Sequence, residues 1–119
     1  MDLEEAQYIT RYYANFFTKE ESLAWRHWST KYKLDHGTYE DEEQRERRKN
    51  ANLERGWMTE DPSILELLTG GIDQFNIRTA QRILHDHEKE VFLNRCEQCK
   101  KLARTPKAKQ CRFCGNDWH

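Results

Sequence analysis

The sequence predicts a mainly helical protein, with four or five short helices followed by a C-terminal β-hairpin module. Apolar residues recur at helical spacing in several segments before residue 88. Capping residues, prolines and glycines separate these segments into individual helices. Two Cys-x-x-Cys pairs in the last 24 residues then mark a small module of a different kind. A chain of 119 residues has room for one domain with such a module attached.

Two helices are predicted in the first third of the chain. Residues 3–17 form the first. Thr18 and Glu21 have capping-box spacing, so the second should run from about residue 19 to 35 and stop near Gly37. Aromatic residues occupy much of its circumference, so we expect it to be covered on more than one side. The apolar residues concerned are Leu3, Ala6, Ile9, Tyr13, Phe16 and Phe17 in the first helix, and Leu23, Ala24, Trp25, Trp28 and Tyr32 in the second.

Residues 39–56 are the least apolar stretch and are predicted to form a solvated helix. Acidic residues lead and basic residues follow, an order that suits the helix dipole. Asp41 with Arg45, and Glu43 with Arg47, stand four positions apart and are expected to pair on an exposed face.

A short helix and a longer one should follow. Asp61 is placed to cap the short helix, Pro62 suits its first position, and glycines at 70–71 end it. The longer helix should cover about residues 73–87, and residues 90–94 should form a short strand. The buried side of the longer helix is predicted to contain Phe75, Ala80, Ile83, Leu84 and His87.

Net charge divides the chain into two parts, which we interpret as a helical region over residues 1–90 and a module over residues 91–119. The first has 13 Lys and Arg against 19 Asp and Glu, a net charge of −6, whereas the second has 7 against 2, a net charge of +5. No low-complexity linker separates them, so we expect the two parts to pack together as one unit.

Four cysteines, Cys96, Cys99, Cys111 and Cys114, have the spacing of a tetrahedral metal site. Two residues within each pair allow a tight turn to direct both sulfurs at one ion while its backbone N–H groups face the thiolates. Two such turns supply four soft ligands, which suit Zn²⁺. The eleven intervening residues are long enough for a hairpin. The sequence therefore predicts one zinc ion per chain, and it is structural because four cysteines leave no open position for catalysis.

Residues 91–119 resemble the zinc ribbon, a structural class built from two zinc knuckles on β-hairpins. The second pair, CRFCG, matches the knuckle pattern, whereas the first, CEQCK, has lysine where a knuckle usually has glycine. Zinc ribbons occur in transcription, translation, adaptor and enzyme proteins, so the resemblance implies a metal and a fold rather than a function. We recognise no family in residues 1–90.

Other uses of the four cysteines are less favoured. Rubredoxins hold redox iron with similar pairs, but lysine follows the first pair here and a large helical partner accompanies the segment. A disulfide framework is less favoured still, because the acidic start lacks a signal-peptide pattern and no apolar run has the length of a membrane span. These features predict a cytoplasmic protein without membrane association, and in a reducing compartment paired cysteines favour metal.

The histidines are predicted to be structural. His85 and His87 are rotated by about 200° on a helix, so a packed His87 and a solvated His85 are favoured over a second metal site. His27 lies on the aromatic side of the second helix and is expected in the core. His119 is a further potential ligand, but four thiolates already suffice.

No catalytic motif is present, so we expect no enzyme and infer no small-molecule substrate. The favoured hypothesis is a protein-interaction module or small regulatory subunit, because tryptophan and tyrosine often anchor interfaces. The alternative is nucleic-acid binding through the basic C-terminal segment, and a third possibility is that this segment docks on the acidic helical part. The candidate contact residues are Arg95, Lys100, Lys101, Arg104, Lys107, Lys109, Arg112 and Trp118.

Overall fold

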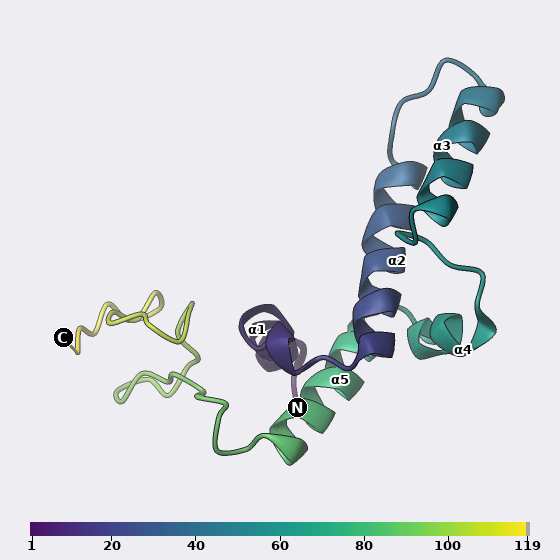
Figure 1. The fold of residues 1–119 in the computed structure, drawn as a ribbon. Helices are drawn as coiled ribbons and strands as arrows, with labels where there is room; N and C mark the ends of the chain where they lie inside the picture. The colour runs from purple at the N-terminus through teal and green to yellow at the C-terminus, as the bar shows by residue number, and fades with distance from the viewer. Residues whose placement is uncertain (119) are drawn as a thin grey trace. The chain divides into compact units, whose positions relative to one another are not determined.

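The computed structural model describes residues 1–118 and is mainly helical (Figure 1). His119 lies outside the described residues. Five α-helices and two short 3-10 helices occur in the described part of the chain. In chain order they are α1 (Leu3–Tyr12), η1 (Ala14–Phe16), α2 (Lys19–Asp35), α3 (Glu42–Glu54), α4 (Pro62–Leu65), η2 (Glu66–Leu68) and α5 (Ile72–Asp86).

The chain forms two compact units. The helical unit is Phe17–Phe75, and the cysteine unit combines residues 1–16 with the chain from Asn76 onward. The boundary between them falls within α5, whose first residues belong to the helical unit. The predicted division near residue 90 stays a prediction.

The helical unit is built on α2 and α3, which lie side by side as an antiparallel pair (Figure 1). Its buried core contains Ala24, Ile64 and Phe75. The Phe17 and Phe75 rings meet edge to face, an arrangement that aromatic quadrupoles favour. Further apolar side chains pack around this core: Phe17, Leu23, Leu67, Leu68 and Ile72.

The predicted helix boundaries of this unit are confirmed by their caps. Thr18 and Glu21 form a complete capping box at the start of α2. Asp61 caps α4, whose first residue is Pro62. The two glycines that follow η2 both have positive φ, the left-handed conformation that glycine adopts without steric cost.

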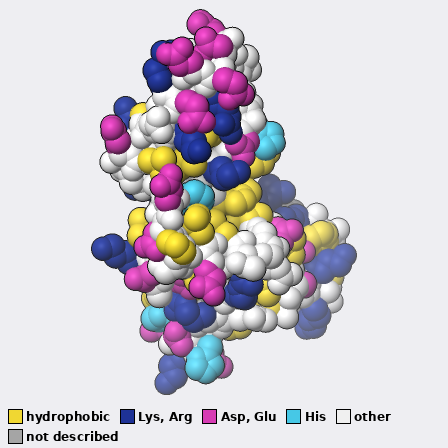
Figure 2. Space-filling view, turned by 90° about the vertical axis from the view of Figure 1, so that its right-hand side faces the viewer, with side chains coloured by type: hydrophobic (Ala, Val, Ile, Leu, Met, Phe, Trp, Pro, Cys, Tyr) yellow, Lys and Arg dark blue, Asp and Glu magenta, His cyan; other side chains and the backbone are white. Residues whose placement is uncertain are grey.

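One predicted ion pair on α3 is confirmed and the other is wrong. Glu43 pairs with Arg47. Asp41 instead caps α3 by accepting the Gln44 N–H, and Arg45 pairs with Asp35 of α2. The capping bond satisfies a backbone donor that has no partner within the helix. At the top of Figure 2, where α3 and the loop before it lie, acidic and basic side chains are interspersed, as expected for a solvated helix.

We predicted that α2 is covered on more than one side; it packs against α3 and α4, but part of its aromatic side is not covered. Its buried residues are Glu21, Ala24, His27 and Leu34, whereas Trp25 and Tyr32 are 41% and 51% exposed. The described part of the chain therefore leaves an aromatic side of α2 open to solvent.

His27 is a core histidine, as predicted, and it holds the loop that follows α3. The Thr59 N–H donates to its Nδ1 at 3.0 Å, so the ring is neutral and carries its proton on Nε2. Burial, and then the charge of Lys31, lower the pKa of His27 below its ordinary value of 6.5.

Acid is therefore expected to destabilise the helical unit through His27. With a folded-state pKa below the unfolded one, the unfolded chain takes up the proton first, so this contribution to stability declines as pH falls below about 6.5. The measurement is hydrogen exchange of α2 across this pH range in the wild type, in His27→Gln and in His85→Gln. Wild type and His85→Gln should lose protection as the pH falls. An equal loss in His27→Gln would show that another group is responsible.

The first helix is shorter than predicted. It ends at Tyr12, and a single 3-10 turn over Ala14–Phe16 continues the chain. The apolar spacing persists through that turn, which is why sequence periodicity alone extended the helix to residue 17.

The predicted strand over residues 90–94 is wrong, because its backbone groups bond to tyrosines of the α1 region. The Phe92 carbonyl accepts from the Tyr8 hydroxyl at 2.6 Å, and the Phe92 N–H donates to the Tyr13 hydroxyl at 2.9 Å. The Asn94 N–H donates to the Tyr8 hydroxyl. With these partners the segment needs no neighbouring strand.

None of the helices in residues 1–118 has the length and apolar character needed to span a membrane.

Candidate metal centre

The four cysteines come together as predicted. Their sulfur atoms all lie within 4.8 Å of one another, and all four are free thiols. Cys96 Sγ lies 3.6 Å from Cys114 Sγ, and Cys99 Sγ lies 3.5 Å from Cys111 Sγ. Tetrahedral zinc with bonds of about 2.3 Å requires sulfur atoms about 3.8 Å apart, whereas a disulfide requires about 2.0 Å. The donor set therefore fits one tetrahedral ion.

The two Cys-x-x-Cys turns have the same backbone hydrogen bonds. In the first, the Lys100 N–H donates to the Cys96 carbonyl at 2.9 Å; in the second, the Gly115 N–H donates to the Cys111 carbonyl at 3.0 Å. Each turn is closed by one isolated antiparallel bridge, Arg95 with Leu102 and Gln110 with Asp117. The chain thus forms the same turn twice, and the two turns direct both pairs of sulfurs toward the same point.

Lysine occupies a glycine conformation in the first turn. Lys100 has φ +65°, and Gly115, its counterpart after the second pair, has φ +78°. The missing glycine in CEQCK therefore leaves the geometry of the turn unchanged, but the lysine side chain bears the steric cost of the left-handed region.

Replacing Lys100 by glycine is therefore expected to tighten zinc binding. Relief of about 1–2 kcal/mol of strain is offset by an entropy cost of about 0.5–1 kcal/mol, so the net gain is up to about 1.5 kcal/mol. Gly115→Ala should have the opposite effect for a purely conformational reason, because a Cβ there would meet no atom within 4 Å. Competition with a chelator measures both. Weaker binding by Lys100→Gly would mean that the lysine side chain contributes more than its conformation costs.

Backbone N–H groups favour the thiolate form of one cysteine in each pair. The Cys99 N–H, followed by that of Gln98, lowers the pKa of Cys96 to about 6 despite burial. The Cys114 N–H likewise lowers the pKa of Cys111. Thiolates are the form that binds zinc, so these N–H groups prepare two of the four ligands.

Cys114, in contrast, favours the protonated thiol. The Asn116 N–H lowers its pKa, but burial and the neighbouring sulfurs, Cys96 first, raise it to about 11. Thiols this close resist ionising together, because each new negative charge repels the next. A divalent cation removes that repulsion, which is a physical reason for this cluster to take up a metal.

Asn94 holds the loop between the two turns, and sequence reasoning missed it. The side-chain Nδ2 of Asn94 donates to the carbonyls of Thr105 at 3.0 Å and Ala108 at 2.8 Å. The backbone carbonyl of Asn94 accepts from the Ala103 N–H at 2.7 Å. The residue is 4% exposed. An asparagine two positions before a metal ligand gives little sequence signal, since the partners of its side chain lie more than ten residues away.

Tyr8 connects the cysteine segment to α1. Its hydroxyl donates to Phe92 and accepts from the Asn94 N–H, so one buried hydroxyl holds two backbone groups. Burial raises the pKa of Tyr8, which keeps it protonated as this donor role requires.

Two of the predicted contact residues pair with α1 instead. Arg95 forms an ion pair with Glu5, and Arg112 forms one with Glu4; both carboxylates belong to the acidic first turn of the helix. The third possibility raised by the sequence, docking of the basic segment on acidic helical residues, is thus observed within the cysteine unit.

The other predicted contact residues have different surroundings. Lys101 and Arg112 both lie over the Phe113 ring, 4.6 and 4.8 Å from its centroid. Trp118 is half-buried, and its backbone N–H donates to the Lys109 carbonyl. Three cations along the connecting loop remain exposed: Arg104, Lys107 and Lys109.

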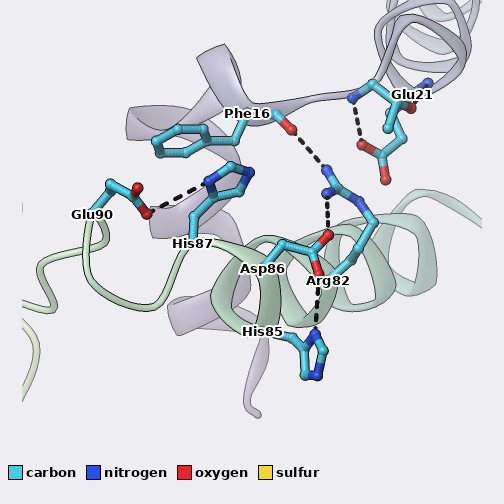
Figure 3. A network of polar contacts seen from close by, with 8 residues as sticks. Phe16, Glu21, Arg82, His85, Asp86, His87 and Glu90 are labelled. Atoms are coloured by element: carbon cyan, nitrogen blue, oxygen red, sulfur yellow. Dashed lines mark hydrogen bonds and ion pairs between the residues drawn. The ribbon is translucent and has the colours of Figure 1, made fainter.

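The two histidines at the end of α5 behave as predicted. His87 stacks on Phe16, with ring centroids 4.0 Å apart, and its Nδ1 lies 3.5 Å from Glu90 (Figure 3). His85 points away from that stack, and its side chain is 88% exposed. The pair therefore shows no convergence on a second ion.

The exposed side of α2 carries a row of four stacked rings, which we call the aromatic row: Trp25, Trp28, Tyr32 and His36. Successive ring centroids lie 5.5, 5.3 and 4.1 Å apart, with interplanar angles of 19°, 27° and 23°. The sequence predicted that Trp25, Trp28 and Tyr32 would be covered, whereas Trp25 and Tyr32 are exposed and Trp28 is half-buried.

The chain has no match among protein-family models, curated proteins or solved structures. The metal centre and the aromatic row are therefore the features from which a function is inferred.

Proposed function

We propose that this protein is a zinc-stabilised protein-interaction module. Four free cysteines within 4.8 Å of one another carry the metal part of the proposal, because they match the number, type and spacing of a structural zinc site. Zinc would be held by Cys96, Cys99, Cys111 and Cys114, and it would supply no chemistry beyond cross-linking the two turns.

In its zinc-bound form, residues 91–119 are proposed to be a small ribbon. The two antiparallel bridges, one at each turn, are the minimal pairing of two short hairpins. Zinc would fix the two turns against each other and so favour longer pairing beside each bridge.

Exposed aromatic rings support the interaction part of the proposal. A solvent-facing tryptophan and tyrosine bring large apolar area to an interface at a low cost in side-chain entropy. The aromatic row places these rings on one rigid helix, so little ordering is needed when a partner binds.

Nucleic-acid binding by the basic segment has less support. Arg95 and Arg112 are engaged with carboxylates of α1, and two cations lie over the Phe113 ring. Stacking of a base on that ring would compete with these cations. The exposed cations of the connecting loop keep this alternative testable.

The experiment is affinity capture from cell extract, with and without nuclease, using three forms of the protein. Wild type and Phe92→Ser are expected to retain the same partner protein, and the double variant Trp25→Ser/Tyr32→Ser is expected to lose it. Phe92 is a matched control because its ring is 57% exposed and its observed hydrogen bonds use only its backbone. Identical captured proteins for all three forms, or material removed by nuclease, would contradict the proposal.

A further inference from the structure

The aromatic row has the spacing by which helices pack together. Trp25, Trp28 and Tyr32 are separated by three and then four residues, the a–d–a spacing of a helix seam. From Trp25 to His36 the row extends about 17 Å along the helix, or three turns. A second helix laid along α2 would match it in length and shape.

The rings of the row lie nearly parallel to one another, with interplanar angles of 19°, 27° and 23°. The surface that they offer to a partner is apolar, so the preference for a charged partner is set by the side chains beside the row.

Cations border the row on both sides. At about 100° per residue, Arg26 and Lys33 lie on one side of the row and Lys31 on the other. Arg26 and Lys33 are exposed, and neither has an ion pair within the described chain. The border is positive although residues 1–90 have a net charge of −6.

The side of the row next to Lys31 stays positively charged although Lys31 forms an ion pair. Lys31 and Arg45 both pair with Asp35, at 2.8 and 2.7 Å, so two positive charges share one negative charge. A carboxylate from a partner would therefore meet uncompensated positive charge beside the rings on either side.

A second copy of the chain fits this surface poorly. If two copies of α2 packed antiparallel about a two-fold axis, Arg26 and Lys33 of each would meet at the same edge and repel. Nucleic-acid bases fit less well at the C-terminal end of the row, since the Tyr32 and His36 rings, with centroids 4.1 Å apart, cover one another's faces.

We propose that the aromatic row docks an acidic amphipathic helix of a partner protein, with apolar side chains against the rings and carboxylates against the bordering cations. This inference rests on the proposed function and adds the chemistry of the partner to it.

The probe is a synthetic helix of three heptads with leucine at a and d and glutamate at e and g. Two matched peptides carry glutamine or lysine at e and g. Like charges at e and g keep the charged peptides from pairing with themselves. Calorimetric titration into zinc-loaded protein should give the tightest binding for the glutamate peptide, by about tenfold over the lysine peptide, with a difference that shrinks in high salt.

Variants of the protein then show which side chains cause the difference in affinity between the peptides. Arg26→Glu/Lys33→Glu should weaken binding of the glutamate peptide and strengthen that of the lysine peptide, and Trp25→Ser/Tyr32→Ser should weaken both. A melting curve for each variant confirms that α2 is folded. Equal affinity for all peptides, or no binding of the glutamate peptide at about 1 mM, would overturn the inference. So would tighter binding of a single-stranded oligonucleotide, or a dimer that Trp25→Ser/Tyr32→Ser disrupts.

The two proposals fail in different ways. If extract capture depends on Trp25 and Tyr32 but the peptides do not discriminate by charge, the interaction function stands and the acidic-helix inference falls. If capture does not depend on these rings, the function itself falls.

Discussion

Removing zinc is expected to unfold residues 91–118 while α2 and α3 stay folded. Two short turns closed by isolated bridges bury too little apolar surface to be stable alone, so the free energy of metal binding is also their folding free energy. For structural zinc sites this contribution is about 10–16 kcal/mol at pH 7. Cys111→Ser should have the same effect as chelation, because it leaves three ligands. Hydrogen exchange before and after chelation measures the loss of protection.

The helical unit provides the internal control for this experiment. Its core of Ala24, Ile64 and Phe75 contains no cysteine, so protection of α2 and α3 should persist after chelation. Protection from hydrogen exchange in residues 92–94, which bond to Tyr8, should fall together with that of the turns. An unchanged melting curve, measured on protein shown to be metal-free, would contradict the proposal that zinc organises the cysteine unit.

Asn94→Ala is expected to have the second largest effect. Its side-chain amide is the buried donor for the carbonyls of Thr105 and Ala108, and alanine would leave both without it. The cost of such a loss is roughly 1–3 kcal/mol, and the zinc-bound protein should unfold at a correspondingly lower denaturant concentration. The connecting loop should also exchange its amide hydrogens faster.

Asn50→Ala is the matched control for this prediction. Asn50 lies exposed on α3, and alanine is the better helix former, so its loss should leave stability unchanged or slightly raised. Equal stability of Asn94→Ala and wild type would mean that water replaces the amide at both carbonyls.

The sequence predicted well those features that depend on neighbours along the chain. The capping box of Thr18 and Glu21, the Asp61–Pro62 start and the glycines after η2 all use partners within four residues. The cysteine cluster was predictable for a related reason, because the chemistry of a four-sulfur shell dictates its own spacing.

The features that sequence reasoning missed depend on distant partners. Residues 90–94 have the composition of a strand, but hydroxyls of Tyr8 and Tyr13 take the hydrogen bonds that a strand would have made. The importance of Asn94 likewise follows from carbonyls more than ten residues away. The exposure of the aromatic row could not be inferred either. An apolar helix side shows only that burying it would be favourable, and does not show whether another part of the chain buries it.

Native mass spectrometry of freshly purified protein, with metal analysis on the same sample, tests the central claim most directly. One zinc ion per chain with all four cysteines in the reduced state is the expected result. Iron in place of zinc, or a metal-free chain with two disulfides, would contradict the claim that zinc holds the two turns together.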